Sequence, residues 1–189
     1  HDSIGSCIGM ASFAMEFCDK VNVVTARNND NVRAIIDKME TLDKYEGIFV
    51  DAVEGQELIS HNTLLIICDV NNPSIFESPE IYENVKNVVI IDHHRKTGEF
   101  ISEPQVTYIE PSASSASELV AEIYEQALKP GTILNTEAEA LFAGIVLDTK
   151  SFTKNTGVRT FLAAHYLRKE GANPSEVEGF FKTTFEDFK

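Results

Sequence analysis

Asp92, His93 and His94 follow one another directly after the apolar run 87–91. That run is typical of a buried parallel strand, and the ligands of α/β proteins collect at the carboxyl ends of such strands. Each polar group that is buried there without a partner costs roughly 1–3 kcal/mol. An acid and two imidazoles at this place therefore indicate a bound metal ion as their partner.

Three more carboxylates have positions that suit ligands of such an ion. Asp69 directly follows a second apolar run, Asp2 is expected in the loop before the first helix, and Asp148 ends an apolar helix where a buried charge needs a cation. With His93 they form a set of oxygen ligands and one imidazole, which favours Mn²⁺ or Mg²⁺ over a thiolate-binding metal. A carboxylate that bridges two such ions would create a two-metal site for in-line phosphoryl displacement.

Each of these residues also has a plainer interpretation. An aspartate after a strand or helix more often caps a helix or forms a turn than binds metal, and this applies to Asp69 and Asp148. His94 could be an ordinary hydrogen-bonded histidine, and the serine-rich stretch 112–117 resembles a capping signature for the following helix. Only the combination of these residues indicates a metal-dependent reaction.

The composition indicates one globular domain in a reducing compartment. A chain of 189 residues with 43% hydrophobic content can bury one sizeable core. Its three cysteines, Cys7, Cys18 and Cys68, show neither the paired spacing of a zinc site nor that of a disulfide framework. The formal net charge of -14 argues against long nucleic acid as a partner. The sequence contains no run of about 18 apolar residues, so we expect no membrane contact by this segment itself.

Apolar runs and helical periodicities alternate along most of the chain. We predict strands at 21–25, 48–50, 63–68, 87–91 and 105–109, and helices at 6–17, 31–42, 79–84 and 114–128. The run 63–68 is apolar on both faces and suits a central strand, whereas 105–109 suits an edge. Helices at 137–147, 158–170 and 174–181 are expected to follow. The predicted fold class is α/β: an open, mostly parallel β-sheet with helices on both faces, followed by a helical C-terminal part.

The segments that carry this chemistry occur in the order of a known set of motifs. Residues 2–6, 68–69, 92–94 and 144–149 resemble the four motifs of the DHH phosphoesterase superfamily, over essentially the whole chain. Residues 110–120, 148–152 and 156–161 are similar to the DHH domain of the membrane-anchored GGDEF/DHH cyclic di-AMP phosphodiesterases. Residues 1–189 would then be a DHH catalytic domain fragment that lacks the start of the first motif and the downstream DHHA1 domain.

The resemblance implies a role for each of the candidate residues. The metal ligands would be Asp2, Asp69, His93 and Asp148, the catalytic residues His94 and Asp92, and the substrate contacts Ser114, Ser115 and Arg159. Asp69 would bridge two Mn²⁺ ions, for which Mg²⁺ or Co²⁺ could substitute. His94 would face the substrate phosphate, and Asp92 would orient its neighbours. The family's other ion also needs a histidine and an aspartate upstream of Asp2, so this fragment is expected to hold at most one ion well and to be weak or inactive alone.

The implied activity is metal-dependent hydrolysis of cyclic di-AMP to the linear dinucleotide, in bacterial signalling. The expected partner is the small cyclic dinucleotide and not long nucleic acid. The full-length parent would be a homodimer anchored in the cell membrane, with this domain on the cytoplasmic face. The same motifs also serve pyrophosphatases, exopolyphosphatases, short-oligonucleotide phosphatases and single-strand exonucleases, and a nucleotide-sensing module without catalysis is a further alternative. The sequence does not separate cyclic di-AMP from cyclic di-GMP or linear dinucleotides.

Overall fold

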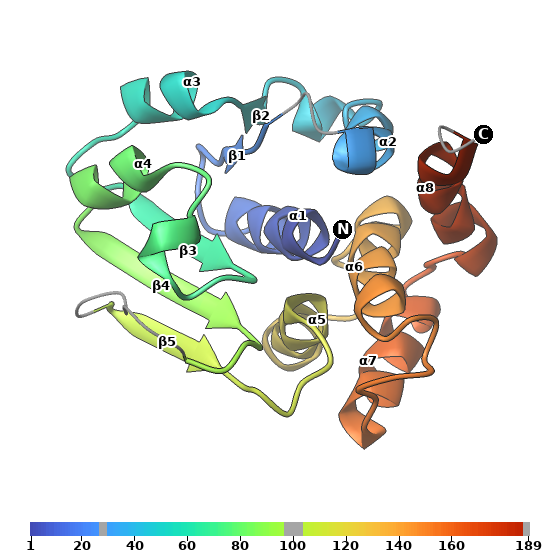
Figure 1. Cartoon of the computed structure of the whole chain (residues 1–189). Helices are drawn as coiled ribbons and strands as arrows, with labels where there is room; N and C mark the ends of the chain where they lie inside the picture. Colours follow the sequence, from blue (N-terminus) through green and yellow to red (C-terminus); the bar gives the residue numbers. More distant parts are fainter. Residues whose placement is uncertain (27–29, 97–103, 187–189) are drawn as a thin grey trace.

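The computed structural model describes residues 1–26, 30–96 and 104–186 (Figure 1). Its elements are, in chain order, α1 (Asp2–Met15), β1 (Val23–Val24), α2 (Asp30–Met39), η1 (Asp43–Tyr45), β2 (Phe49–Val50), α3 (Ala52–Glu57), β3 (Leu64–Cys68), η2 (Pro73–Ile75), α4 (Pro79–Asn84), β4 (Asn87–Asp92), β5 (Val106–Ile109), α5 (Ala116–Ala127), α6 (Asn135–Asp148), α7 (Val158–Lys169) and α8 (Pro174–Glu186). The predicted class is confirmed: open parallel sheets with helices packed on them precede a helical C-terminal part.

The described strands form two parallel sheets. One holds β1 and β2, and the other has the order β3-β4-β5, with Ile66 opposite Val89. The prediction of a central strand at 63–68 is wrong, because β3 pairs with β4 alone among the described strands. The reason is that only the carboxyl half of this apolar run is buried, whereas Leu64 is 53% exposed. β4 is the central strand, and the predicted edge strand is confirmed as β5.

Helices cover both faces of the three-stranded sheet. Side chains alternate along a strand, so Val88 and Ile90 of β4 lie on one face, in a small cluster that includes Tyr82 of α4. Ile91 points to the other face and joins the main core with residues of α1 and α5. Figure 1 shows α1 and α5 on this second side, away from α4. The carboxyl ends of β3 and β4 therefore open beside the start of α1.

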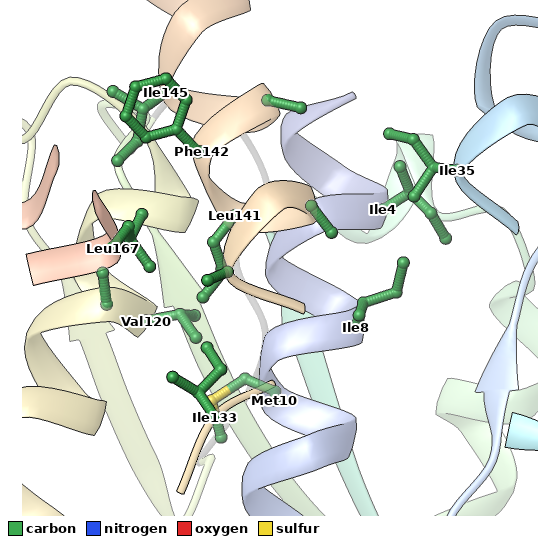
Figure 2. Close-up of a cluster of buried hydrophobic side chains, with 14 of the residues drawn as sticks. Ile4, Ile8, Met10, Ile35, Val120, Ile133, Leu141, Phe142, Ile145 and Leu167 are labelled. Atoms are coloured by element: carbon green, nitrogen blue, oxygen red, sulfur yellow. The ribbon is translucent and has the colours of Figure 1, made fainter. Parts of the chain in front are cut away.

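The main core depends on a close approach between α1 and α6. Figure 2 shows Leu141 of α6 on one side of α1 and Ile4 and Ile8 on the other, where Ile4 lies beside Ile35 of α2; all four side chains are buried. Gly5 makes this approach feasible, because a Cβ atom there would lie 2.4 Å from the carbonyl oxygen of Ala140. The two helices thus pack backbone against backbone, next to the carboxylates described below.

Local hydrogen bonds explain where two of the helices begin. α1 starts at Asp2, so the predicted loop before residue 6 is wrong: the Gly5 amide already donates to the His1 carbonyl, at 2.9 Å. α5 starts at Ala116 and not at Ser114, because the Ser115 side chain is the N-cap and accepts the Glu118 amide at 3.0 Å.

The sequence analysis missed α3, η1 and η2. The start of α3 carries a clear signal, a capping box in which Asp51 and Glu54 bond each other's backbone amides. At six residues, α3 is too short to show a helical periodicity. Within the described residues, none of the helices is both long and apolar enough to cross a membrane.

We expect Gly5→Ala to destabilise the protein by roughly 1–3 kcal/mol, the usual cost of overpacking a core. The added methyl group would meet a backbone carbonyl, which cannot move without shifting α6. Gly179→Ala is the matched control, since a Cβ atom in the middle of α8 meets nothing within 4 Å. That variant should gain about 0.5–1 kcal/mol from helix propensity. Urea denaturation measures both, and equal stabilities would contradict the close packing of α1 on α6.

Candidate metal centre

The four predicted metal ligands meet around one imidazole nitrogen. His93 Nε2 lies 3.3 Å from Asp148 Oδ2, 3.4 Å from Asp69 Oδ1 and 3.7 Å from Asp2 Oδ2. Two atoms that each bind one ion at about 2.1 Å are roughly 3.0–3.4 Å apart. The ligand atoms come from the start of α1 and from the ends of β3, β4 and α6, so the spacing is that of a coordination sphere assembled from four elements.

Two of these atoms have no hydrogen-bond partner in the described part of the chain. They are Asp69 Oδ1 and His93 Nε2, and both are buried. Buried polar atoms without partners are rare in folded proteins and call for a specific explanation. A divalent cation supplies it, because oxygen and imidazole donors suit Mn²⁺ and, with fewer nitrogens, Mg²⁺. The residues present therefore fit the metal that the sequence predicts.

Asp2 is anchored to the N-terminus of α5. Its carboxylate oxygens accept the backbone amides of Ala116 at 2.7 Å and Ser117 at 2.9 Å, where the helix dipole favours a negative charge. Even so, burial raises the pKa of Asp2 to about 7, and the charges of Asp69 and Asp148 add to this effect. Gly144 of α6 leaves the room for this arrangement, since a Cβ atom there would lie 2.7 Å from Asp2 Oδ1.

Asp69 offers one oxygen to the centre and gives the other to α1. It follows β3 with a positive φ of 65°, and its amide still donates to the Ile91 carbonyl at 2.9 Å. Ser3 Oγ donates to Asp69 Oδ2 at 2.6 Å, which leaves Oδ1 facing His93. Burial acts to raise the pKa of Asp69, but His93 and Ser3 outweigh it, so that the pKa lies below its usual value.

The imidazole of His93 lies in the negative electrostatic potential of the three carboxylates. Burial acts to lower its pKa, but the neighbouring Asp148 and Asp69 carboxylates dominate and raise the pKa to about 10. This ring contacts all three carboxylates, at 3.3–3.7 Å. A divalent cation would take over that role and provide more charge.

Asp92 points away from the cluster and holds the turn that follows β4. It is fully buried, and its Oδ1 accepts the amides of His93 at 2.8 Å and His94 at 3.1 Å. The same oxygen lies 2.8 Å from the His94 ring Nδ1. The His94 side chain is 57% exposed. His93 thus turns into the protein and His94 turns outward.

Asn71 also contacts Asp92, and the sequence analysis missed it as a site residue. Its side-chain amide donates to Asp92 Oδ2 and to the His94 carbonyl oxygen. In the sequence it is one of two asparagines before a proline, a pattern that predicts a loop and gives no sign of this contact.

The chain leaves Asp148 through a left-handed turn. Residues 150–152 have φ values of 47°, 56° and 62°, a conformation that costs roughly 1–2 kcal/mol for each residue that is not glycine. The buried Thr149 holds this turn, since its hydroxyl donates to the Ile145 carbonyl at 2.6 Å and accepts the Phe152 amide at 2.9 Å. The predicted burial of Asp148 is wrong, because α6 ends at the rim of the site and leaves this side chain 25% exposed.

The three predicted substrate contacts are engaged with the protein itself. Ser115 caps α5, and the Ser114 amide donates to the Glu118 carboxylate at 3.0 Å. Both serines are buried. Arg159 donates to both oxygens of Glu122, at 2.7 and 2.6 Å. Their contact with a substrate stays a prediction.

We expect Mn²⁺ to raise the melting temperature of this chain, because an ion at 100 times its Kd adds about 2.7 kcal/mol of stability. His93→Ala should abolish the effect, since it removes the nitrogen that all three carboxylates face. His61→Ala, at an exposed position, is the matched control and should keep it. A thermal melt with and without Mn²⁺ gives the answer, and an unchanged response of His93→Ala would place the ion elsewhere.

Comparison with known proteins gives consistent similarities. The sequence model "DHH family, N-terminal domain" matches residues 1–145. The cyclic-di-AMP phosphodiesterase GdpP of Bacillus subtilis is 38% identical over 99% of this chain, and the cyclic-di-AMP phosphodiesterase PdeA of Listeria monocytogenes is 38% identical over 97% of it. The chain spans 29% of the length of each of these relatives.

A solved structure has a similar fold. The crystal structure of an exopolyphosphatase-related protein from Bacteroides fragilis aligns with a TM-score of 0.75 and 21% identity. The alignment covers 100% of this chain and 54% of that protein. At this identity the similarity concerns the fold, and it includes all the elements that position the carboxylates.

Proposed function

The chain belongs to the DHH family, and on this premise we propose that it is the DHH catalytic domain of a metal-dependent phosphodiesterase that hydrolyses cyclic di-AMP to the linear dinucleotide. The observation that carries the proposal is the convergence of three carboxylates on His93 Nε2 at 3.3–3.7 Å. Similarity over nearly the whole chain to two proteins named as cyclic-di-AMP phosphodiesterases supports the choice of substrate.

In the proposed mechanism, some residues of the chain bind the metal ions and others orient these ligands. Asp2, His93 and Asp148 would hold one divalent cation, and Asp69 would be a ligand of this ion and of a second one. Bound Mn²⁺, or Mg²⁺ or Co²⁺ in its place, would supply Lewis acidity, charge for the phosphoryl oxygens and a lowered pKa of water. Ser3 orients Asp69, and the amides of α5 orient Asp2.

His94 is proposed to face the phosphate. The carboxylate oxygens of Asp92 act as acceptors, so the His94 Nδ1 donates to one of them and the Nε2 edge is left for the substrate. At 57% exposure, the ring can reach a molecule in solution. Nε2 can then take a proton from a group of the substrate or donate one to it.

The remaining features of the whole protein are also part of the proposal. We propose that the parent protein is a homodimer with a DHHA1 domain and a membrane anchor. The remaining ligands of the second ion would also come from residues outside this chain. Ser114, Ser115 and Arg159 are proposed to contact the substrate.

Asp69→Ala in the intact protein should abolish Mn²⁺-dependent hydrolysis of cyclic di-AMP. Loss of an outer-shell group already costs about 10–100-fold, so loss of a ligand of both ions should cost more. Asp19→Ala, at an exposed position, is the control. Product formation is followed by chromatography, with pyrophosphate as a parallel substrate. Turnover by Asp69→Ala would disprove the bridging role, and preference for pyrophosphate would favour the pyrophosphatase alternative. Metal binding without hydrolysis would favour a sensing module.

His94→Ala should leave the bound Mn²⁺ unchanged and lower kcat by about 10²–10³-fold, the typical loss for one group that stabilises a transition state. The ring is held by Asp92 and not by the three carboxylates around His93, which is why the metal should stay. Metal content is measured by atomic absorption beside the kinetics, with the exposed His165→Ala as the control. Loss of the metal would make His94 a ligand.

A further inference from the structure

Asn71 is neither one of the candidate metal ligands nor one of the residues proposed to face the substrate, but it lies close to both groups. It follows Asp69 by two residues, in the loop after β3, and is buried with 6% exposure. Its side-chain nitrogen donates to Asp92 Oδ2 and, at 3.2 Å, to the carbonyl oxygen of His94. One amide thus bonds the backbone of His94 and also the carboxylate that orients the ring of His94.

The neighbouring Asn72 has the ordinary role of an asparagine in a loop. Its Oδ1 accepts the Ser74 amide at 3.0 Å and the Ser74 hydroxyl at 2.8 Å, which caps η2. The turn before Pro73 is therefore explained by Asn72, and turn formation does not explain the burial of Asn71. Of the two adjacent asparagines, Asn72 forms the turn and Asn71 contacts the site.

The contacts of Asp92 show what Asn71 contributes. Oδ1 of Asp92 bonds the amides and the ring of the two residues that directly follow it. Oδ2 bonds Asn71, which is the hydrogen-bond partner of the Asp92 carboxylate from another segment in the described part of the chain. A buried carboxylate that loses such a donor is left with an unsatisfied acceptor, which is unfavourable. Asn71 thereby fixes the rotation of the carboxylate, and with it the oxygen that faces the His94 ring.

The alternative position for the His94 ring is close by. His94 Nδ1 is 2.8 Å from Asp92 Oδ1 but also only 3.7 Å from Asp69 Oδ1, the oxygen that faces the metal centre. A rotated Asp92 would leave the ring free to turn toward Asp69. The bond from Asn71 therefore favours the arrangement in which His94 stays on Asp92 and Asp69 stays available.

We propose that Asn71 is a positioning residue for the phosphodiesterase reaction, which holds Asp92 and thereby fixes the tautomer and direction of His94. This inference rests on the proposed function, and Asn71 itself touches neither substrate nor metal. Because it joins the loop after Asp69 to the turn after β4, it keeps the metal-binding and the substrate-facing parts of the site in register.

The test compares Asn71→Leu, which keeps the volume, and Asn71→Ala with Asn72→Ala as the control. Nitrogen NMR of the histidine rings in the metal-free 189-residue chain reads the tautomer of His94, with the signal assigned by His94→Ala. We expect the Nδ1–H form in the unmodified chain and in Asn72→Ala, and a mixture of tautomers in both Asn71 variants. Retention of the Nδ1–H form in both would overturn the proposal.

Kinetics of the intact protein provide the second measurement. The Asn71 variants should lose about 10–100-fold in kcat, as is typical for residues that orient a catalytic group, with KM and Mn²⁺ affinity nearly unchanged. A fall in Mn²⁺ affinity as large as the fall in kcat would overturn the positioning role and make Asn71 a support of the metal ligands. If the intact protein fails to cleave cyclic di-AMP at all, the proposed function fails, whereas the NMR comparison still decides the role of Asn71.

Discussion

The structure depends on the concentration of negative charge around a single imidazole. Three carboxylates lie within 3.7 Å of His93 Nε2, in a region where Asp2 is almost fully buried. Like charges at this distance repel strongly when water is excluded. Burial, reinforced by the charges of Asp69 and Asp148, raises the pKa of Asp2, and the Asp148 and Asp69 carboxylates raise the pKa of His93 against the opposing effect of burial. A divalent cation bound among these groups would relieve this repulsion.

The contact between α1 and α6 determines both the packing of the core and the positions of the candidate metal ligands. The approach of α1 to α6 through Gly5 forms the centre of the hydrophobic core, and it also brings the first residue of α1 beside the last turn of α6. Gly144 leaves space for Asp2 and Ser117 in the same contact. A change that separates the two helices would therefore affect the core and the ligand geometry together. The carboxylates are held by rigid elements, which suits a site that must keep its geometry under repulsion.

The turn after β4 divides two tasks between adjacent histidines. His93 turns toward the buried carboxylates, while His94 stays largely exposed on Asp92. Asp92 has the least exposure of the three and takes no part in the cluster, and its charge is satisfied by amides and by Asn71. The same short segment thus supplies a candidate metal ligand, a carboxylate that holds the turn and a ring that is largely exposed.

The sequence by itself determined the local features of this protein. The apolar runs before Asp69 and Asp92 marked the strand ends, and the helix at 79–84 was predicted with its observed bounds. These features depend on neighbours in the chain, which a sequence pattern records. The tertiary structure decided the rest: Asp2 opens a helix and bonds an amide 114 residues away, β3 is not central, Asn71 reaches Asp92, and the chain leaves Asp148 through a left-handed turn. The physical reason is that hydrogen bonds and close packing between distant segments produce no periodic pattern in the sequence. The candidate ligands could therefore be identified from the sequence, whereas their arrangement around one imidazole nitrogen could be seen only in the tertiary structure.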